Sequence, residues 1–101
     1  MKIISKGNMY ITFAAYLNQL RADEMNKPSQ ERKDVPNIEQ LASAADRHPI
    51  NFSTFINGKS KTFNLEVAQA ALDELWRLGF TPQITDIIKY IPPEMDNGKT
   101  D

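Results

Sequence analysis

The 101-residue chain contains no cysteine, and this absence excludes several kinds of site. Disulfide frameworks, thiolate metal sites and thiol nucleophiles all require cysteine. The single histidine, His48, excludes a His-rich metal cluster, and we interpret it as a residue at a helix entry or in solvent. The sequence also lacks a phosphate-binding glycine loop, a metal-ligand spacing and a nucleophile–base arrangement. It therefore predicts neither an enzyme nor a bound metal or small-molecule cofactor.

Long apolar runs are scarce as well. The longest apolar stretches, 11–17 and 67–75, are short or interrupted by polar residues, whereas a membrane-spanning helix needs about 20 apolar residues. No segment resembles a signal peptide. We therefore expect a soluble cytoplasmic protein without a membrane partner, associated with the nucleoid if it binds DNA. With 41% apolar residues, the chain has room for one domain with one modest core.

Strong charge of either sign is absent, since the formal net charge is −1. The charges are nevertheless unevenly distributed along the chain. Residues 1–61 hold nine Lys or Arg against six Asp or Glu, and residues 62–101 hold three against seven. This asymmetry permits a phosphate-facing side and an acidic back, but a solvated surface can also produce it.

Apolar residues at helical spacing predict about five helices, and capping residues locate their ends. Thr12 is a suitable N-terminal cap, and Asn37 with Gln40 three residues later has the spacing of a capping box. Gly58 and Gly79 are typical left-handed stops. The predicted helices span about 13–24, 38–45, 48–57 and 65–78, and a last one starts at Thr81 or Thr85, carries Ile84, Ile87, Ile88 and Ile91 on one face and ends at Pro92.

Residues 41–61 have the pattern of a helix-turn-helix. One apolar helical face ends at a polar break over 46–48, and a second apolar face follows and ends at Asn57-Gly58. Two short helices around a tight turn suit the reading of the DNA major groove. The apolar positions are Leu41, Ala42 and Ala45 before the break and Phe52, Phe55 and Ile56 after it.

The chain resembles the Cro and lambda-repressor type (XRE-type) helix-turn-helix proteins. In that family a Leu-Ala pair is followed, sixteen residues after the Leu, by Asn-Gly and a basic stretch. Here Leu41-Ala42 is followed by Asn57-Gly58-Lys59-Ser60-Lys61. Segments similar to 64–66 and 86–92 are also common in the family, so the resemblance covers about 13–92. Two positions depart from it, because Asp46 replaces the usual turn Gly and Arg47 replaces a small apolar residue.

The resemblance implies an all-α fold, a compact bundle of about five helices of the lambda-repressor-like type. Residues 1–9 are then an N-terminal arm, 10–93 the helix-turn-helix domain and 94–101 a disordered tail. Within the domain, residues 26–36 contain two prolines and several charged residues with almost nothing apolar to bury. We expect this segment to be a loop.

The resemblance also implies which residues contact DNA. The helix over 48–57 would lie in the major groove, where Asn51 could pair with adenine or with phosphate, Thr54 could bond a base edge and Ile50 could pack on a thymine methyl. Ser53 and Thr54 could equally be plain solvated residues, and Arg47 with His48 an ordinary exposed turn. The implied base-reading residues are Pro49, Ile50, Asn51 and Thr54, and the implied phosphate contacts are Asn37, Arg47, His48, Ser53, Asn57, Lys59 and Lys61.

Two other residue groups have alternative interpretations. The aromatic residues Phe52, Phe55, Trp76 and Phe80 could form a stacking platform for single-stranded nucleic acid, but their helical spacing favours core packing. The acidic residues Glu66, Asp73 and Glu74 have no matched partner site. We interpret them as a solubilising face and not as a catalytic carboxylate pair.

The sequence thus favours a sequence-specific DNA-binding transcriptional regulator. It would bind double-stranded DNA without a cofactor and as a homodimer, because two turns of helix read only a few base pairs. Candidate dimer surfaces are the Ile-rich last helix and the N-terminal arm. The competing interpretation is a helix-turn-helix module for protein interaction, an antitoxin or adaptor with little or no DNA binding.

Overall fold

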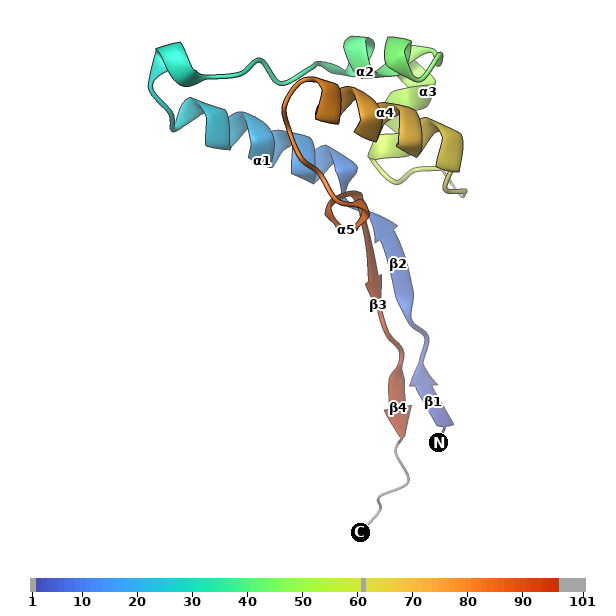
Figure 1. Ribbon diagram of the computed structural model, residues 1–101. Coiled ribbons are helices and arrows are strands. Elements are labelled where there is room, and N and C mark those ends of the chain that lie inside the picture. The colour runs from blue at the N-terminus through green and yellow to red at the C-terminus, as the bar shows by residue number, and fades with distance from the viewer. Residues whose placement is uncertain (1, 61, 97–101) are drawn as a thin grey trace.

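The computed structural model describes residues 2–60 and 62–96 as a helical body with a projecting pair of strands (Figure 1). Two antiparallel two-stranded sheets accompany the helices, so the fold is mixed α/β and the prediction of an all-α bundle is wrong. Within this described part, the elements in chain order are β1 (Lys2–Ser5), β2 (Asn8–Ile11), α1 (Phe13–Met25), a 3₁₀ turn (Ser29–Glu31), α2 (Ile38–Ala44), α3 (Pro49–Ile56), α4 (Leu65–Arg77), α5 (Ile84–Ile87), β3 (Ile88–Ile91) and β4 (Glu94–Asp96).

Antiparallel pairing of the strands brings together the segments 2–11 and 88–96. β2 pairs with β3, with Ile11 opposite Ile88, and β1 pairs with β4, with Lys2 opposite Asp96. The two sheets follow one another away from the helices (Figure 1), and we call residues 2–11 with 88–96 the terminal ribbon. The radius of gyration is 17.3 Å, whereas a compact chain of this length would have about 13 Å. The terminal ribbon therefore projects from the body and does not fold back on it.

The prediction of one helix through Ile84, Ile87, Ile88 and Ile91 is wrong. α5 ends at Ile87, because Ile88 adopts an extended conformation with φ −141° and ψ 142°. The same isoleucines suit a strand, since β-branched residues pack well on a pleated surface. A short apolar run does not distinguish the two structures by periodicity. The partner strand β2, some 80 residues earlier, decides in favour of β3.

The structure also differs from the predicted N-terminal arm and disordered tail. Part of the tail expected to be disordered, Glu94–Asp96, forms β4 against β1. Residues 2–5 and 8–9 of the expected N-terminal arm lie in β1 and β2. The last five residues of the tail, 97–101, lie outside the described residues. The described segments 2–11 and 88–96, near the two ends of the sequence, thus belong to one ribbon.

The predicted helix ends are largely confirmed. The capping box at α2 is present, with Asn37 Oδ1 accepting from Gln40 N–H and Gln40 Oε1 accepting from Asn37 N–H, both at 2.8 Å. Gly58 and Gly79 follow α3 and α4 with φ of 73° and 94°. Thr12 differs, because its hydroxyl donates to Asp86 O at 2.9 Å instead of capping α1. It thereby ties α1 to α5 at the base of the terminal ribbon.

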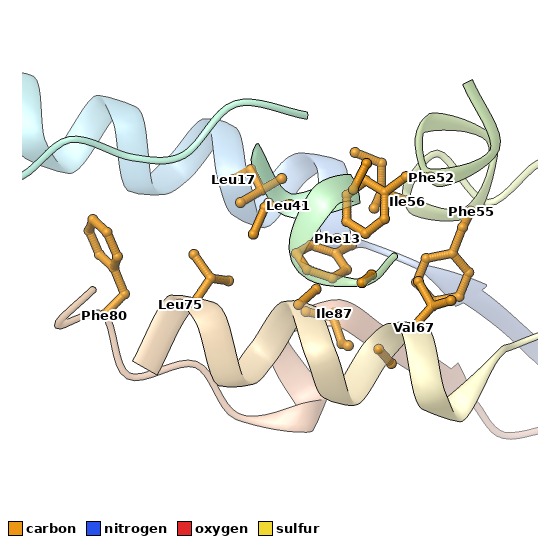
Figure 2. Close-up of a cluster of buried hydrophobic side chains, with 14 residues drawn as sticks. Phe13, Leu17, Leu41, Phe52, Phe55, Ile56, Val67, Leu75, Phe80 and Ile87 are labelled. Atoms are coloured by element: carbon orange, nitrogen blue, oxygen red, sulfur yellow. The ribbon is translucent and has the colours of Figure 1, made fainter. Parts of the chain in front are cut away.

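The hydrophobic core draws at least one large side chain from each α-helix (Figure 2). Phe52 of α3 is fully buried and meets Phe13 of α1 edge to face, with ring centroids 6.1 Å apart. The predicted core packing is confirmed for Phe52, Phe55 and Phe80 but is wrong for Trp76, which is 51% exposed and donates its Nε1–H to Pro82 O. The largest fully buried side chains are those of Phe13, Leu17, Leu41, Phe52, Leu75 and Ile87.

None of the helices in the described ranges combines the length and the apolar character that crossing a membrane requires.

The segment 26–36 is held to the body by Glu24, which is buried at the end of α1. Its carboxylate accepts from Lys27 Nζ at 2.8 Å and from the backbone N–H of Lys33 at 2.6 Å. The hydrogen bond from Lys27, followed by that from Lys33, lowers the pKa of Glu24 below its ordinary value. The folded state therefore favours the ionised carboxylate.

Replacing Glu24 should make stability less dependent on pH. A carboxyl group whose pKa is lowered by folding stabilises the folded state above its unfolded pKa, near 4.3, and loses this contribution as the pH falls through the folded pKa. We expect Glu24→Gln to lower the free energy of unfolding at pH 7 and to approach the native protein at pH 3. Urea denaturation at several pH values measures this. Glu31→Gln, at an exposed side chain, is the control, and a deficit of Glu24→Gln that stayed constant with pH would contradict the assignment.

Candidate nucleic-acid interface

The structure folds residues 38–56 into two short helices that pack on each other around a four-residue connection. Ala42 of α2 is fully buried and Phe52 anchors α3 from the other side of the turn. The small side chain of Ala42 lets the two helices approach closely. The two helices and the turn between them lie where the sequence predicted them.

The turn between α2 and α3 contains a left-handed residue that is not glycine. Asp46 has a φ of 55°, and it occupies the position after the helix where glycine is usual. The N–H of Asp46 donates to Ser43 O at 3.1 Å, and the N–H of Arg47 donates to Ala42 O at 2.8 Å. These two bonds form a Schellman motif. The C-terminus of α2 is therefore capped in the usual way, although Asp46 carries a side chain.

Removing the side chain of Asp46 should stabilise the protein. The left-handed conformation costs an L-residue about 1–2 kcal/mol, less for Asp and almost nothing for glycine. We expect Asp46→Gly to raise the free energy of unfolding by about 0.5–1 kcal/mol, measured by urea denaturation. Ala44→Gly, at an exposed helical position of α2, should lower it by about 1 kcal/mol. Destabilisation by both variants would show that the side chain of Asp46 makes stabilising contacts that outweigh the cost of its left-handed conformation.

The predicted base-reading residues lie on the outer side of α3. Ile50 is 69% exposed, and Asn51 and Thr54 are exposed as well, whereas Pro49 is half-buried at the first turn. Thr54 Oγ1 donates to Ile50 O at 3.0 Å. The side chain of Asn51 makes no hydrogen bond to any other residue in the described part of the chain, so both its donor and its acceptor are available. Since Phe52, Phe55 and Ile56 are buried on the opposite side, α3 is a fixed helix whose exposed side carries both polar residues and Ile50.

His48 is the N-cap residue of α3, and its exposed ring is held by the helix backbone. Its Nδ1 accepts from the N–H of Ile50 at 3.2 Å, which fixes the proton of a neutral ring on Nε2. Pro49 then occupies the first helical position, where its missing N–H is not needed. A phosphate contact from His48 would use Nε2–H.

Arg47 stands at the start of α3 and borders a surface pocket of about 290 Å³. The side chain is exposed, and its Nη1 donates to Asp46 O at 3.3 Å. Three polar residues that the sequence did not single out line the same pocket from the connection to α4: Ser60, Thr62 and Asn64. The polar composition of 59–64 was the available signal, but only folding places this segment beside Asn51 and Thr54.

Other predicted phosphate contacts are partly engaged within the protein. Both the side-chain oxygen and the N–H of Asn37 belong to the capping box, so its Nδ2–H₂ group is what remains to be offered. Asn57 Nδ2 donates to Ser53 O at 2.8 Å and lies 3.3 Å from Ser53 Oγ. This pairing holds the last turn of α3 and reduces what Ser53 and Asn57 can donate.

Charge around α3 is mixed. Lys59 is exposed just after α3, and Arg47 is exposed just before it, so a cation stands at each end of the helix. Lys61, the other predicted basic contact, lies outside the described residues. Glu39 and Asp46 line a second surface hollow beside His48 and Pro49. These carboxylates repel a polyanion that approaches the N-terminal side of α3.

Metal chemistry has no candidate site in residues 2–60 and 62–96. No group of three or more His, Asp or Glu side chains in these ranges is arranged to hold a metal ion. The prediction of a protein that is not an enzyme rests on the sequence.

Comparison of the chain with known protein families, with characterised proteins and with solved structures found no match.

Proposed function

We propose that the protein is a sequence-specific DNA-binding regulator that places α3 in the major groove. One observation carries the proposal: α3 is clamped to the core by one face and presents Ile50, Asn51 and Thr54 on the other. A recognition helix needs this arrangement, because base readout requires side chains held rigidly at the groove floor. Arg47 and Lys59 flank the helix where phosphate backbones border a groove.

Each chemical contact has a specific role in this proposal. Asn51 offers a donor and an acceptor that match the N6 and N7 edge of adenine. Ile50 supplies an apolar surface for a thymine methyl, and Thr54 supplies a hydroxyl once its bond to Ile50 O is exchanged. Since eight residues of helix reach only a few base pairs, two copies on a two-fold symmetric site are needed for useful specificity.

The salt dependence of binding tests the proposal. Fluorescence anisotropy with a random duplex pool, at about 50 and 200 mM salt, measures the affinity at each condition. If Arg47, Lys59 and Lys61 each neutralise one phosphate, the affinity should fall roughly 40-fold per copy between the two conditions. Selection from the same pool should then enrich a symmetric site. Absence of duplex binding at the lower salt would overturn the proposal.

A protein-docking role for the same face is the competing proposal. Ile50 is a large apolar side chain with 69% exposure, and Glu39 and Asp46 lie beside the start of α3. An apolar centre with acidic neighbours suits a protein partner better than a phosphate backbone. Under this proposal, duplex binding is absent at low salt, and Ile50→Ala weakens capture of the partner while Asn51→Ala does not.

A further inference from the structure

An open groove of about 420 Å³, which we call the α4 groove, runs along the outer side of α4. Leu65, Leu72 and Trp76 line it at spacings of seven and four residues, which place them on one side of the helix. Ala68 is buried between them, and Ile84 of α5 lines the groove as well. Leu65, Trp76 and Ile84 are 73%, 51% and 49% exposed. Exposed apolar side chains that lie singly need no explanation, whereas a group that lines one hollow is typical of a binding surface.

Trp76 is held in a fixed position in the α4 groove. Its Nε1–H donates to Pro82 O at 3.0 Å, and Pro82 is buried. Val67 and Leu75 anchor the opposite side of α4 in the core (Figure 2). The indole ring therefore needs little ordering when a partner covers it, which lowers the entropic cost of binding. Tryptophan is also among the residues that most often dominate the binding energy of protein interfaces.

Two carboxylates lie beside the apolar stripe of the α4 groove. Asp73 lines the groove, and Glu66, seven residues earlier, lies on the same side of the helix. Both are exposed, and neither makes a hydrogen bond or an ion pair within residues 2–60 and 62–96. Glu74 differs, because its carboxylate accepts from Arg77 Nε at 2.8 Å and from Arg77 Nη2 at 2.6 Å. Arg77 is thereby engaged with Glu74, and the charges of Glu66 and Asp73 are left for a partner.

The charge around the α4 groove indicates the chemistry of its occupant. Residues 62–101 hold three Lys or Arg against seven Asp or Glu, so this part of the chain repels a nucleic acid or an anionic lipid surface. A protein segment with apolar side chains flanked by Lys or Arg is complementary to it. Its apolar side chains cover the stripe, while its cations meet Glu66 and Asp73. A cation over the ring of Trp76 gains a further cation–π attraction.

The length of the α4 groove suits a short amphipathic helix. At about 1.5 Å per residue, the apolar stripe from Leu65 to Trp76 is roughly 16 Å long, or about three helical turns. Amphipathic helices that dock in grooves present apolar anchors at positions i, i+3 or i+4, and i+7, which span about two turns. The stripe is therefore long enough for such a set of anchors and for a flanking cation.

We propose that the α4 groove binds a basic amphipathic helix of a partner protein. Apolar anchors of the partner pack against Leu65, Leu72 and Trp76, and its Lys or Arg side chains meet Glu66 and Asp73. Among the described residues, the α4 groove shares no lining residue with the two hollows that border α3. The proposal therefore does not depend on DNA binding, and its failure would leave the DNA proposal unaffected.

The fluorescence of Trp76 tests the proposal on the full chain, because Trp76 is its single tryptophan. The probes are two helical peptides of about 14 residues without aromatic side chains, both with Leu at i, i+3, i+7 and i+10. The other positions are Ala and Lys in one peptide and Ala and Glu in the other. We expect the Lys peptide to shift the emission to shorter wavelength and to bind at least about tenfold more tightly than the Glu peptide. No shift with the Lys peptide up to about 1 mM, or equal affinity for the two peptides, overturns the proposal.

Two substitutions, each with a matched control, locate the binding to the α4 groove. Asp73→Lys should weaken binding of the Lys peptide about tenfold, because it replaces an attraction by a repulsion. Glu31→Lys makes the same change of charge on the exposed 3₁₀ turn and should have little effect. Leu65→Gln should weaken binding about fivefold by removing an apolar contact, whereas Met25→Gln, at 65% exposure against 73% for Leu65, should not. Circular dichroism shows that each variant remains folded.

Dilution of the native protein distinguishes a partner helix from a second copy of the chain. If a second copy covered the α4 groove, the emission of Trp76 without peptide would move to longer wavelength on dilution from about 100 to 0.1 μM. That result overturns the proposal, as does equal weakening of peptide binding by Asp73→Lys and Glu31→Lys. Emission that does not change with protein concentration supports a groove that is open to a partner.

Discussion

Phe52→Ala is expected to lower the free energy of unfolding by about 3–5 kcal/mol. Phe52 is fully buried, and its ring packs against Phe13 at 6.1 Å and Phe55 at 6.4 Å. It is therefore the contact through which α3 holds to α1, and the substitution leaves a cavity at the centre of the core. Since small domains are stable by only about 5–15 kcal/mol, much of the stability would be lost. Urea denaturation followed by circular dichroism measures the effect.

Ile50→Ala is the matched control for Phe52→Ala. It also removes a large apolar side chain from α3, but Ile50 is 69% exposed, and a surface substitution should change the free energy of unfolding by no more than about 0.5 kcal/mol. Similar losses for the two variants would mean that the outer side of α3 is buried in solution. In that case α3 would not have a free face for DNA.

Asn51→Ala is expected to reduce affinity for the selected duplex by about 1–3 kcal/mol, or roughly 5- to 150-fold. The side chain is exposed and unpaired within the described residues, so the loss should come from base contacts and not from a weakened fold. Affinity for a scrambled duplex should change little. Anisotropy titrations on the selected and scrambled duplexes give both values, and thermal denaturation of the variant checks that the fold is intact.

Lys59→Ala is the comparison for Asn51→Ala. Lys59 is exposed next to the end of α3, and a phosphate contact carries no base information. It should therefore weaken binding to selected and scrambled duplexes by the same factor and reduce the salt dependence by about one phosphate contact. If the two variants behaved identically on both duplexes, the division between base reading and phosphate contact would be wrong.

Local signals predicted the helical half of this protein well. Asn37 with Gln40 and Gly58 with Gly79 determine helix ends through hydrogen bonds and φ values that involve only neighbouring residues. The division of α3 into a buried and an exposed side followed from 3.6-residue periodicity in the same way. The groove-facing positions of the candidate interface could therefore be placed before the structure, although their role in DNA binding stays a prediction.

The exposure of Trp76 and the pocket beside α3 depend on long-range contacts, which the sequence analysis did not predict. Trp76 was placed in the core by its spacing, yet its side chain is 51% exposed and its Nε1–H donates to Pro82 O. The pocket beside α3 was missed because Ser60 and Thr62 reach Asn51 only through the course of the connection to α4. Neither arrangement has a local signature.

The sequence by itself determined α2, α3 and the turn between them, since caps, stops and apolar periodicity act over a few residues and need no distant partner. Only the tertiary structure decided that residues 2–11 and 88–96 form paired strands. Ile88–Ile91 has apolar positions that suit a helix or a strand, and its pairing with Asn8–Ile11 selects the strand. A strand is completed by hydrogen bonds to another segment, and the identity of that segment is not written in the residues that form the strand. The terminal ribbon therefore follows from the tertiary structure alone.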